Sequence, residues 1–207
     1  MADTRPIARS PIAAAEPVVH AAGWEVSARR SESALRLTDC TPLTKVLLLA
    51  PHDSPLAHNL GVAFREARRD DDVLVVGSGP GEWTLLAPPG AAATVIDRWR
   101  PADGDGHVSV IDLTHGRALV RLTGTDAAPL LSKLCAIDLA DAVTPNGSAF
   151  RSSVAKVAAD VIRDDVDDDQ SYLLHCERSS GQYFFDALLD AGQEFGIEVE
   201  GFVERAD

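Results

Sequence analysis

The residues best suited to chemistry gather in residues 112–139, which read DLTHGRALVRLTGTDAAPLLSKLCAIDL. The turn at the start of this stretch brings together the carboxylate of Asp112, the hydroxyl of Thr114 and the imidazole of His115, groups that could transfer protons. Short polar side chains also hydrogen-bond the backbone where a strand ends, which is the structural alternative. We expect His115, beside Gly116, to be a turn residue with an exposed ring.

A glycine-rich segment, GSGPGEW at residues 77–83, raises the possibility of a phosphate cradle. Such a loop needs a strand before it and a helix directly after it, so that helix N–H groups point at the phosphate. Here the following residues, EWTLLAP, are typical of a strand, and no Lys-Ser/Thr follows. The pattern therefore predicts a hairpin.

Metal binding is not supported by the acidic and histidine residues. The run DDVDDDQ at residues 164–170 lacks the central glycine and terminal glutamate of a calcium loop, so we expect a solvated turn between strands. The six histidines show no ligand-type spacing. His175 and Cys176 alternate along a predicted strand and should face opposite sides.

Nucleophilic chemistry finds little support either. Ser179-Ser180 lacks the Gly-x-Ser-x-Gly elbow. Cys135 lies late in an amphipathic helix, where a core position is expected rather than the electropositive setting of a nucleophile. Arg178 ends a strand before a plausible helix cap; it could bridge to a carboxylate or a neighbouring chain, or be a surface arginine.

Composition bounds the class of protein. The chain has 207 residues, 45% hydrophobic, with a formal net charge of -13. Nucleic acid and an anionic membrane surface are disfavoured as partners, since both attract basic proteins. The three cysteines, Cys40, Cys135 and Cys176, form no disulfide framework and are expected to be buried thiols. Without a signal-like or membrane-spanning run, we expect a cytoplasmic protein.

Periodicity and turn residues predict an alternation of strands and helices. The predicted elements, in chain order, are two strands around a turn in 34–50, a helix from Ser54-Pro55 to about Arg68, a hairpin over 72–88, a helix at 90–100, a loop at 103–106, strand–turn–strand over 107–124, a helix at 125–135, a loop or edge segment at 140–153, an ambiguous helix or strand at 154–164, a strand at 172–178 and a helix at 180–196.

Residues 1–32 are expected to form an arm, and residues 33–207 the folded domain. Pro6, Pro11 and Pro17 should prevent regular structure through most of the arm. The arm nevertheless keeps apolar residues such as Ile12 and Trp24, which a disordered tail seldom does. Two interpretations remain open: the arm folds back on its own domain, or it lies on a partner.

An internal repeat is predicted from a shift of about 73 residues. The shift places Asp39 on Asp112 and Thr41 on Thr114, and the order strand–strand–helix–hairpin–helix recurs. We therefore predict an α+β fold of two pseudo-repeated, ferredoxin-like halves, over residues 34–100 and 107–196.

The stretch at residues 112–139 resembles the Asp-Leu-Ser/Thr-His…Gly-x-Asp-Ala…Leu…Asp-Leu signature of the aminomethyltransferase, or folate-binding T-protein, superfamily. Within it the chain is most similar to the γ subunits of heterotetrameric sarcosine oxidases. The segments that carry this likeness are RSPI at 9–12, LRLTDCT at 35–41, GPGEWTLLAP at 79–88 and CERSSGQYFFDALLDAGQEFG at 176–196. The resemblance covers nearly the whole chain and implies a fold like the folate-binding domain of aminomethyltransferases.

The chain departs from the superfamily where catalysis would be expected. Folate-dependent members resembling this chain carry a Gly-Gly-x-x-Asp-Asp-type segment, and the matching place here reads FRSSVAKVAAD. Both the glycine pair and the acidic pair are absent by this comparison, and Asp160 comes too late to match. The resemblance therefore implies a subunit with no catalytic, cofactor-binding or metal site of its own, since function depends on sites and not on folds.

The resemblance further implies a cytosolic complex with α, β and δ subunits. That complex would oxidatively demethylate sarcosine to glycine, pass the one-carbon unit to tetrahydrofolate, and hold FAD, FMN, NAD and tetrahydrofolate in the partner subunits. This chain would be a structural subunit of an oxidoreductase acting on CH–NH donors, in sarcosine catabolism and one-carbon metabolism. The candidate residues for its subunit interface are Arg9, Pro11, Ile12, Trp24 and Arg178.

Two alternatives stay open. The chain could be a stand-alone folate-binding aminomethyltransferase-like protein, which would need a carboxylate near the pterin, for example that of Asp138 or Asp141. It could also be a γ-type subunit of a demethylase that acts on another N-methyl amine.

Overall fold

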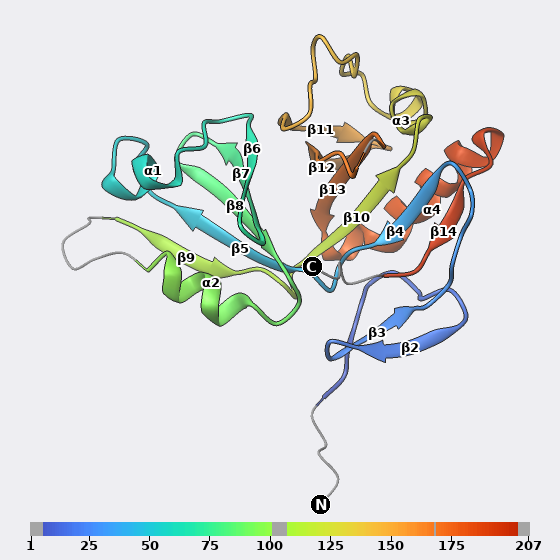
Figure 1. The fold of residues 1–207 in the computed structure, drawn as a ribbon, viewed down its shortest axis with the longest axis horizontal. Coiled ribbons are helices and arrows are strands. Elements are labelled where there is room, and N and C mark those ends of the chain that lie inside the picture. The colour runs from blue at the N-terminus through green and yellow to red at the C-terminus, as the bar shows by residue number, and fades with distance from the viewer. Residues whose placement is uncertain (1–5, 101–106, 168, 203–207) are drawn as a thin grey trace, which may run out of the picture.

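Two β-sheets packed face to face form the centre of the molecule, and helices cover the outer face of each sheet (Figure 1). The computed structural model describes residues 6–100, 107–167 and 169–202, so the loop predicted at residues 103–106 lies outside the described residues. The result is four layers in the order helices, sheet, sheet, helices. An antiparallel sheet and a mixed sheet, each covered by helices, confirm the predicted α+β class.

The first sheet has five strands in the order β6-β7-β8-β5-β9. Its strands are β5 Thr44–Leu49, β6 Ala67–Asp70, β7 Val73–Gly79, β8 Glu82–Ala87 and β9 Ser109–Asp112, and its helices are α1 Pro55–Leu60 and α2 Ala92–Arg98. Side chains alternate along β7 as the pleat requires. Val73 and Val75 pack with the helices, whereas Leu74 and Val76 face the second sheet.

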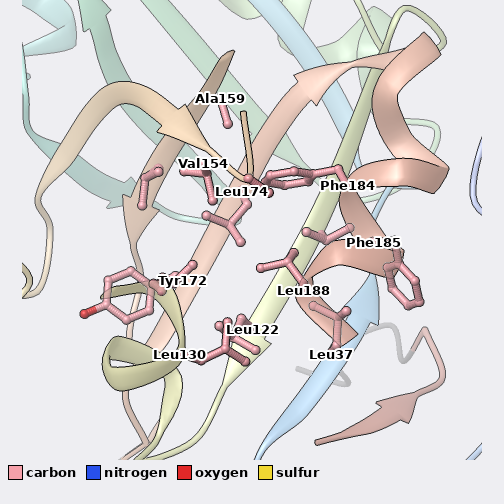
Figure 2. Packing of buried hydrophobic residues seen from close by; sticks show 14 of the residues in the cluster. Leu37, Leu122, Leu130, Val154, Ala159, Tyr172, Leu174, Phe184, Phe185 and Leu188 are labelled. Atoms are coloured by element: carbon pink, nitrogen blue, oxygen red, sulfur yellow. The ribbon is translucent and has the colours of Figure 1, made fainter. Parts of the chain in front are cut away.

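The second sheet has six strands in the order β11-β12-β13-β10-β4-β14, with β14 parallel to β4. Its strands are β4 Arg36–Asp39, β10 Arg117–Thr123, β11 Ala149–Val154, β12 Val157–Arg163, β13 Ser171–Glu177 and β14 Glu198–Glu200; its helices are α3 Ala127–Leu134 and α4 Gly181–Gly192, with 3-10 turns at Arg178–Ser180 and Gln193–Phe195. Phe184 and Leu188 of α4 pack with Leu174 in the largest core cluster (Figure 2).

Strand exchange joins the two sheets. Strand β4 pairs with β10 of the second sheet, although β5 follows it in the first; β9 pairs with β5 of the first sheet, although β10 follows it in the second. Each sheet therefore includes one strand from the part of the chain that otherwise builds the other sheet. The predicted repeat, and the ferredoxin-like description of each half, stay predictions.

The helix predicted from Ser54 to about Arg68 is wrong in its length. Ser54 caps it as predicted, because its hydroxyl accepts a hydrogen bond from the Ala57 N–H at 3.1 Å. The helix ends at Leu60, since Gly61 adopts the left-handed conformation with φ 58°. The charged residues beyond it form the edge strand β6, where charges discourage further pairing.

The arm is more ordered than its prolines suggested. Residues 8–27 form a three-stranded sheet of β1 Ala8–Arg9, β2 Val18–Ala21 and β3 Trp24–Ser27, in the order β1-β3-β2. The prolines lie outside these strands, so they do not interrupt the ladder. Ile12, Trp24 and Val26 are buried, so the arm folds back on its own domain.

Two further predictions are settled by the strand pairing. The glycine-rich segment is the hairpin between β7 and β8, with no helix after it, as predicted. The ambiguous segment at residues 154–164 is the strand β12, which lies between β11 and β13. Its alanines fit a strand here because Ala159 is buried under the helices of the second sheet.

Candidate functional site

Four titratable side chains meet between the two sheets and are called here the Asp160 cluster: Glu82, Arg151, Asp160 and His175. Asp160 and His175 are cross-strand partners on β12 and β13. Their neighbours Ala159 and Cys176 pack toward the helices, so Asp160 and His175 point toward the first sheet. Glu82 of β8 completes the cluster from that sheet.

Hydrogen bonds occupy both oxygens of the Asp160 carboxylate. Arg151 donates from Nε to Oδ1 at 2.6 Å and from Nη2 to Oδ2 at 3.3 Å. The His175 Nδ1 lies 3.4 Å from Oδ2. The same Arg151 Nη2 also donates to Glu82 Oε1 at 3.0 Å, which links the second sheet to the first.

Burial and pairing shift the pKa values in this cluster. Burial raises the pKa of Asp160, but the hydrogen bonds from His175 and Arg151 outweigh it and hold that pKa below its usual value. Burial lowers the pKa of His175, which is 5% exposed. His175 Nε2 is buried and has no hydrogen-bond partner among the described residues. A neutral imidazole is thus favoured at neutral pH.

The structure places Asp160 four residues after a tight turn between β11 and β12. Ala155 and Lys156 form the two-residue turn between β11 and β12, and both have positive φ, at 49° and 66°. Glycine is the residue that such turns favour. A glycine pair at this turn would put the two acids at positions 159 and 160. Ala159 and Asp160 occupy these positions here, and whether Asp160 corresponds to an acid of the family segment stays a prediction.

The two predicted Asp-x-Thr turns are structural. The Thr41 N–H donates to Asp39 Oδ1 at 2.9 Å, and the Thr114 N–H donates to Asp112 Oδ1 at 2.9 Å. The Thr41 hydroxyl then accepts from the Leu119 N–H at 3.2 Å. Each turn thus fixes a strand end, as predicted.

Lys45 lies beside these turns with its side chain fully buried. Its backbone N–H donates to the Thr114 hydroxyl at 3.1 Å. Its ammonium donates to the carbonyls of Thr41 and Leu43, both at 2.7 Å. Burial lowers the pKa of Lys45 to about 8, and Asp39 opposes that shift. Sequence analysis gave no signal for it, because nothing in LTKVLLLA marks the lysine as buried.

The residues predicted for a subunit interface are placed within the chain itself. Trp24 is 4% exposed, and its ring stacks on the His115 imidazole with centroids 4.9 Å apart. His115 is exposed, as predicted. Ile12 is 3% exposed and belongs to the core cluster under α4. The side chains of Ile12 and Trp24 therefore contact this chain in the described conformation.

Arg178 bridges segments of its own chain and not a carboxylate. It donates from Nη2 to the Arg9 carbonyl at 2.7 Å, which fastens the arm to the second sheet. Arg9 is exposed and pairs with Glu25 at 3.0 Å, and Pro11 is half-buried against Gly181. Whether any of the five contacts another subunit stays a prediction.

The acidic run at residues 164–170 is not simply a solvated turn. Asp164 is buried, and its Oδ2 accepts from Arg69 Nη2 and from Arg121 Nη2, both at 2.6 Å. Arg69 belongs to β6 of the first sheet and Arg121 to β10 of the second, so Asp164 ties the sheets together. A sequence run of acids gives no sign of which member points inward.

Asp138 and Asp141 are the two acids predicted for a folate contact. Asp141 accepts from Arg163 Nη1 at 2.6 Å, which lowers the pKa of its carboxyl. Asp138 accepts from the Ala140 N–H at 3.0 Å in its own turn. The described residues contain no group of three or more His, Cys, Asp or Glu side chains placed to hold a metal ion. All three cysteines are buried and free, as expected.

The clefts that indent the described surface include the following three. One of about 520 Å³ is lined by Pro11, Glu177, Arg178, Ser179 and Gln182, and a narrow crevice lies under the arm next to Asp39 and Phe185. The third, of about 650 Å³, lies where residues 61–68 meet residues 143–150 and is called here the junction cleft. Asp160 and His175 line none of the three, so the Asp160 cluster does not open into them.

The sequence pattern of the GCVT N-terminal domain matches residues 65–205 of the chain. An aminomethyltransferase of Geobacillus thermodenitrificans is 30% identical over 128 residues, which make up 61% of this chain and 34% of that protein. Human mitochondrial dimethylglycine dehydrogenase is 26% identical over 133 residues, 63% of this chain and 15% of that protein. The chain thus spans about a third of the first relative and less of the second.

Two solved structures share the fold. A chain of the heterotetrameric sarcosine oxidase from Corynebacterium sp. U-96, in complex with pyrrole 2-carboxylate, matches with a TM-score of 0.69 and 26% identity, over 86% of this chain and 92% of that one. Aminomethyltransferase T of the glycine cleavage system from Bartonella henselae matches with a TM-score of 0.70 and 14% identity, over 89% of this chain and 55% of that one. None of the helices in the described ranges has the length and hydrophobicity that a bilayer crossing requires.

Proposed function

The chain belongs to the family of the GCVT N-terminal domain, and we propose that it serves there as a γ-type structural subunit of a sarcosine-oxidase-like complex. The carrying observation is the match in size and sequence to one chain of a heterotetrameric sarcosine oxidase, which it covers over 92% at 26% identity. The domain boundaries, with an arm at 1–32 and a folded domain of two repeated halves at 33–207, belong to the same proposal, as does a place in the cytosol.

The geometry of the Asp160 cluster supports a non-catalytic role. Both oxygens of Asp160 already accept hydrogen bonds from Arg151 and His175, which supports a structural use of this carboxylate. Asp160 also lines none of the three clefts described above. We therefore assign tetrahydrofolate, FAD, FMN and NAD to the α and β partner subunits and derive no chemical step on this chain.

Co-expression with the products of adjacent genes tests the proposal. We expect the chain to co-purify at fixed stoichiometry with a large flavoprotein, and the complex to oxidise sarcosine. Omission of this chain should lower the yield or thermal stability of the complex while its flavin spectrum is retained. A chain that stays monomeric with every neighbouring product would contradict the proposal.

A stand-alone folate-binding protein is the second candidate, and the family match over residues 65–205 favours it. Calorimetric titration of the isolated chain with tetrahydrofolate separates the two. We expect no heat of binding for the wild type. Saturable binding that Asp160→Asn abolishes would favour the second candidate. A panel of N-methyl amines offered to the complex distinguishes sarcosine from another substrate of a related demethylase.

A further inference from the structure

The junction cleft has the features of an interaction surface. We infer that it binds an acidic, partly apolar segment of another subunit. The inference deepens the proposed function and rests on it, because the partner is a subunit of the proposed complex. None of the five residues predicted for an interface lines this cleft.

The floor of the cleft is fixed by backbone hydrogen bonds between the two sheets. The Ala67 N–H donates to the Gly147 carbonyl at 2.7 Å, and the Ala149 N–H donates to the Arg65 carbonyl at 2.9 Å. Glu66 and Ser148 form a β-bridge between these bonds. The cleft is thus preformed, which lowers the entropy lost when a segment binds.

Arg65 is held in a strained conformation at the edge of this floor. Its φ is 75°, in the left-handed region where a side chain is disfavoured. Its N–H donates to the Gly77 carbonyl at 3.0 Å and its carbonyl accepts from Ala149, so the backbone has no freedom to relax. Glycine would satisfy this geometry more easily. Arg65 also lines the cleft, so an arginine at this strained position points to a use for its side chain there.

A second guanidinium lies in the same cleft. Arg68 donates from Nη2 to the Leu60 carbonyl at 3.0 Å, which positions its planar group over the end of α1. Arg68 lines the cleft together with Arg65. Glu66 directs one carboxylate oxygen to the Ala63 N–H at 3.2 Å. Two arginines presented together suit carboxylate groups, which they bind through paired hydrogen bonds.

Exposed apolar side chains adjoin these charges. Phe64, directly before Arg65, is 51% exposed, and Val143 of the cleft wall is 59% exposed. Aromatic residues and arginine are the types enriched in the centre of protein interfaces. The chain as a whole carries a net charge of -13, so most of its surface repels an acidic segment. A pair of arginines at one cleft offers such a segment local charge complementarity.

The test uses Arg65→Gly and Arg68→Gln in the co-expressed complex, with Lys156→Gly as the matched control. Lys156 is also exposed, positively charged and at positive φ, so its replacement changes charge and backbone strain in the same way at a distant turn. The dissociation constant for the partner subunits is measured by analytical ultracentrifugation at two salt concentrations.

We expect Arg65→Gly to raise the melting temperature of the isolated chain and to weaken assembly at least tenfold, with a shallower salt dependence. Lys156→Gly should raise the melting temperature and leave assembly unchanged. The inference is overturned if both arginine variants assemble within twofold of the control, while the proposed function then stands. If the wild type assembles with no product of an adjacent gene, both the inference and the proposed function are contradicted. If the wild type self-associates and Arg65→Gly abolishes that self-association, the cleft binds a second copy of this chain, and the inference of a different subunit is overturned.

Discussion

Lys45 shows how far the environment of one residue can depart from its type. A fully buried ammonium is held by two backbone carbonyls between the sheets. Removing its charge by deprotonation relieves the desolvation that burial imposes. His175 behaves in the same way in the same interior, because burial lowers its pKa and favours the neutral imidazole. Both residues make stability depend on pH in ways that surface residues do not.

The contribution of Lys45 to stability should rise by about 1 kcal/mol between pH 8 and pH 9, because the unfolded state keeps the Lys45 proton that the folded state releases. The folded pKa of about 8 lies below the unfolded value, so the unfolded chain binds more protons in this window. Urea unfolding of the wild type and Lys45→Met measures the gain, which the variant should lack. The raised pKa values of Cys40 and Cys176, about 11, reverse the trend above pH 9. An equal rise in the variant would contradict the assignment.

Acid should destabilise the wild type through His175. Its folded pKa is lowered, so below its unfolded pKa the unfolded state binds the extra proton and stability falls as pH drops. The slope has a limit of about 1.4 kcal/mol per pH unit for one proton. His175→Asn should flatten the loss between pH 6.5 and 5, whereas His20→Asn on an exposed strand should not. Identical slopes in all three proteins would refute this role.

At the scale of elements, turns determine how the strands meet. Gly61 ends α1 early, which frees residues 67–70 to become an edge strand and places Arg65 and Arg68 in the junction cleft. The turn at Ala155 and Lys156 sets the register of β12, and with it the pairing of Asp160 and His175. A shift of one residue would send both side chains to the helical face.

Lys156→Gly should stabilise the chain by about 0.5–1 kcal/mol, because glycine adopts the left-handed conformation without the steric penalty of a side chain. The greater conformational entropy of glycine in the unfolded chain cancels only part of this gain. Lys156 is exposed at φ 66°, so no packing is lost. Ala158→Gly, at an exposed position inside β12, is the control and should destabilise by a similar amount. Thermal unfolding followed by circular dichroism compares the three proteins; a lower melting temperature for Lys156→Gly would count against the turn assignment.

At the scale of the whole molecule, two separate sheets must be held face to face. An apolar cluster that includes Leu86, Leu119 and Leu173 fills the space between them. Strand exchange links their ends, and two sets of ion pairs, around Asp164 and around Arg151, join them at the side. The arm is fastened separately, by Arg178 and by the Trp24 stack.

Asp164→Asn should cost about 2–3 kcal/mol of unfolding free energy, since it leaves two arginines without their shared carboxylate; the partial exposure of Arg69 keeps the loss below that of a fully buried pair. Asp169→Asn, in the same loop with a more exposed pair to Arg36, is the control and should cost less than about 1 kcal/mol. Chemical denaturation measures both. Equal effects would mean that Asp164 does not tie the sheets.

The sequence by itself determined the α+β class, the Ser54 cap, the glycine hairpin and the role of the two Asp-x-Thr turns, because each depends on residues close in the chain. The tertiary structure alone decided that residues 67–70 form an edge strand, that the arm closes on its own domain, and that Asp160 meets His175 and Arg151. It also decided that Lys45 is buried and that Arg65 and Arg68 share a cleft. These features depend on which strands pair and which face each side chain takes, and residues far apart in the chain fix both.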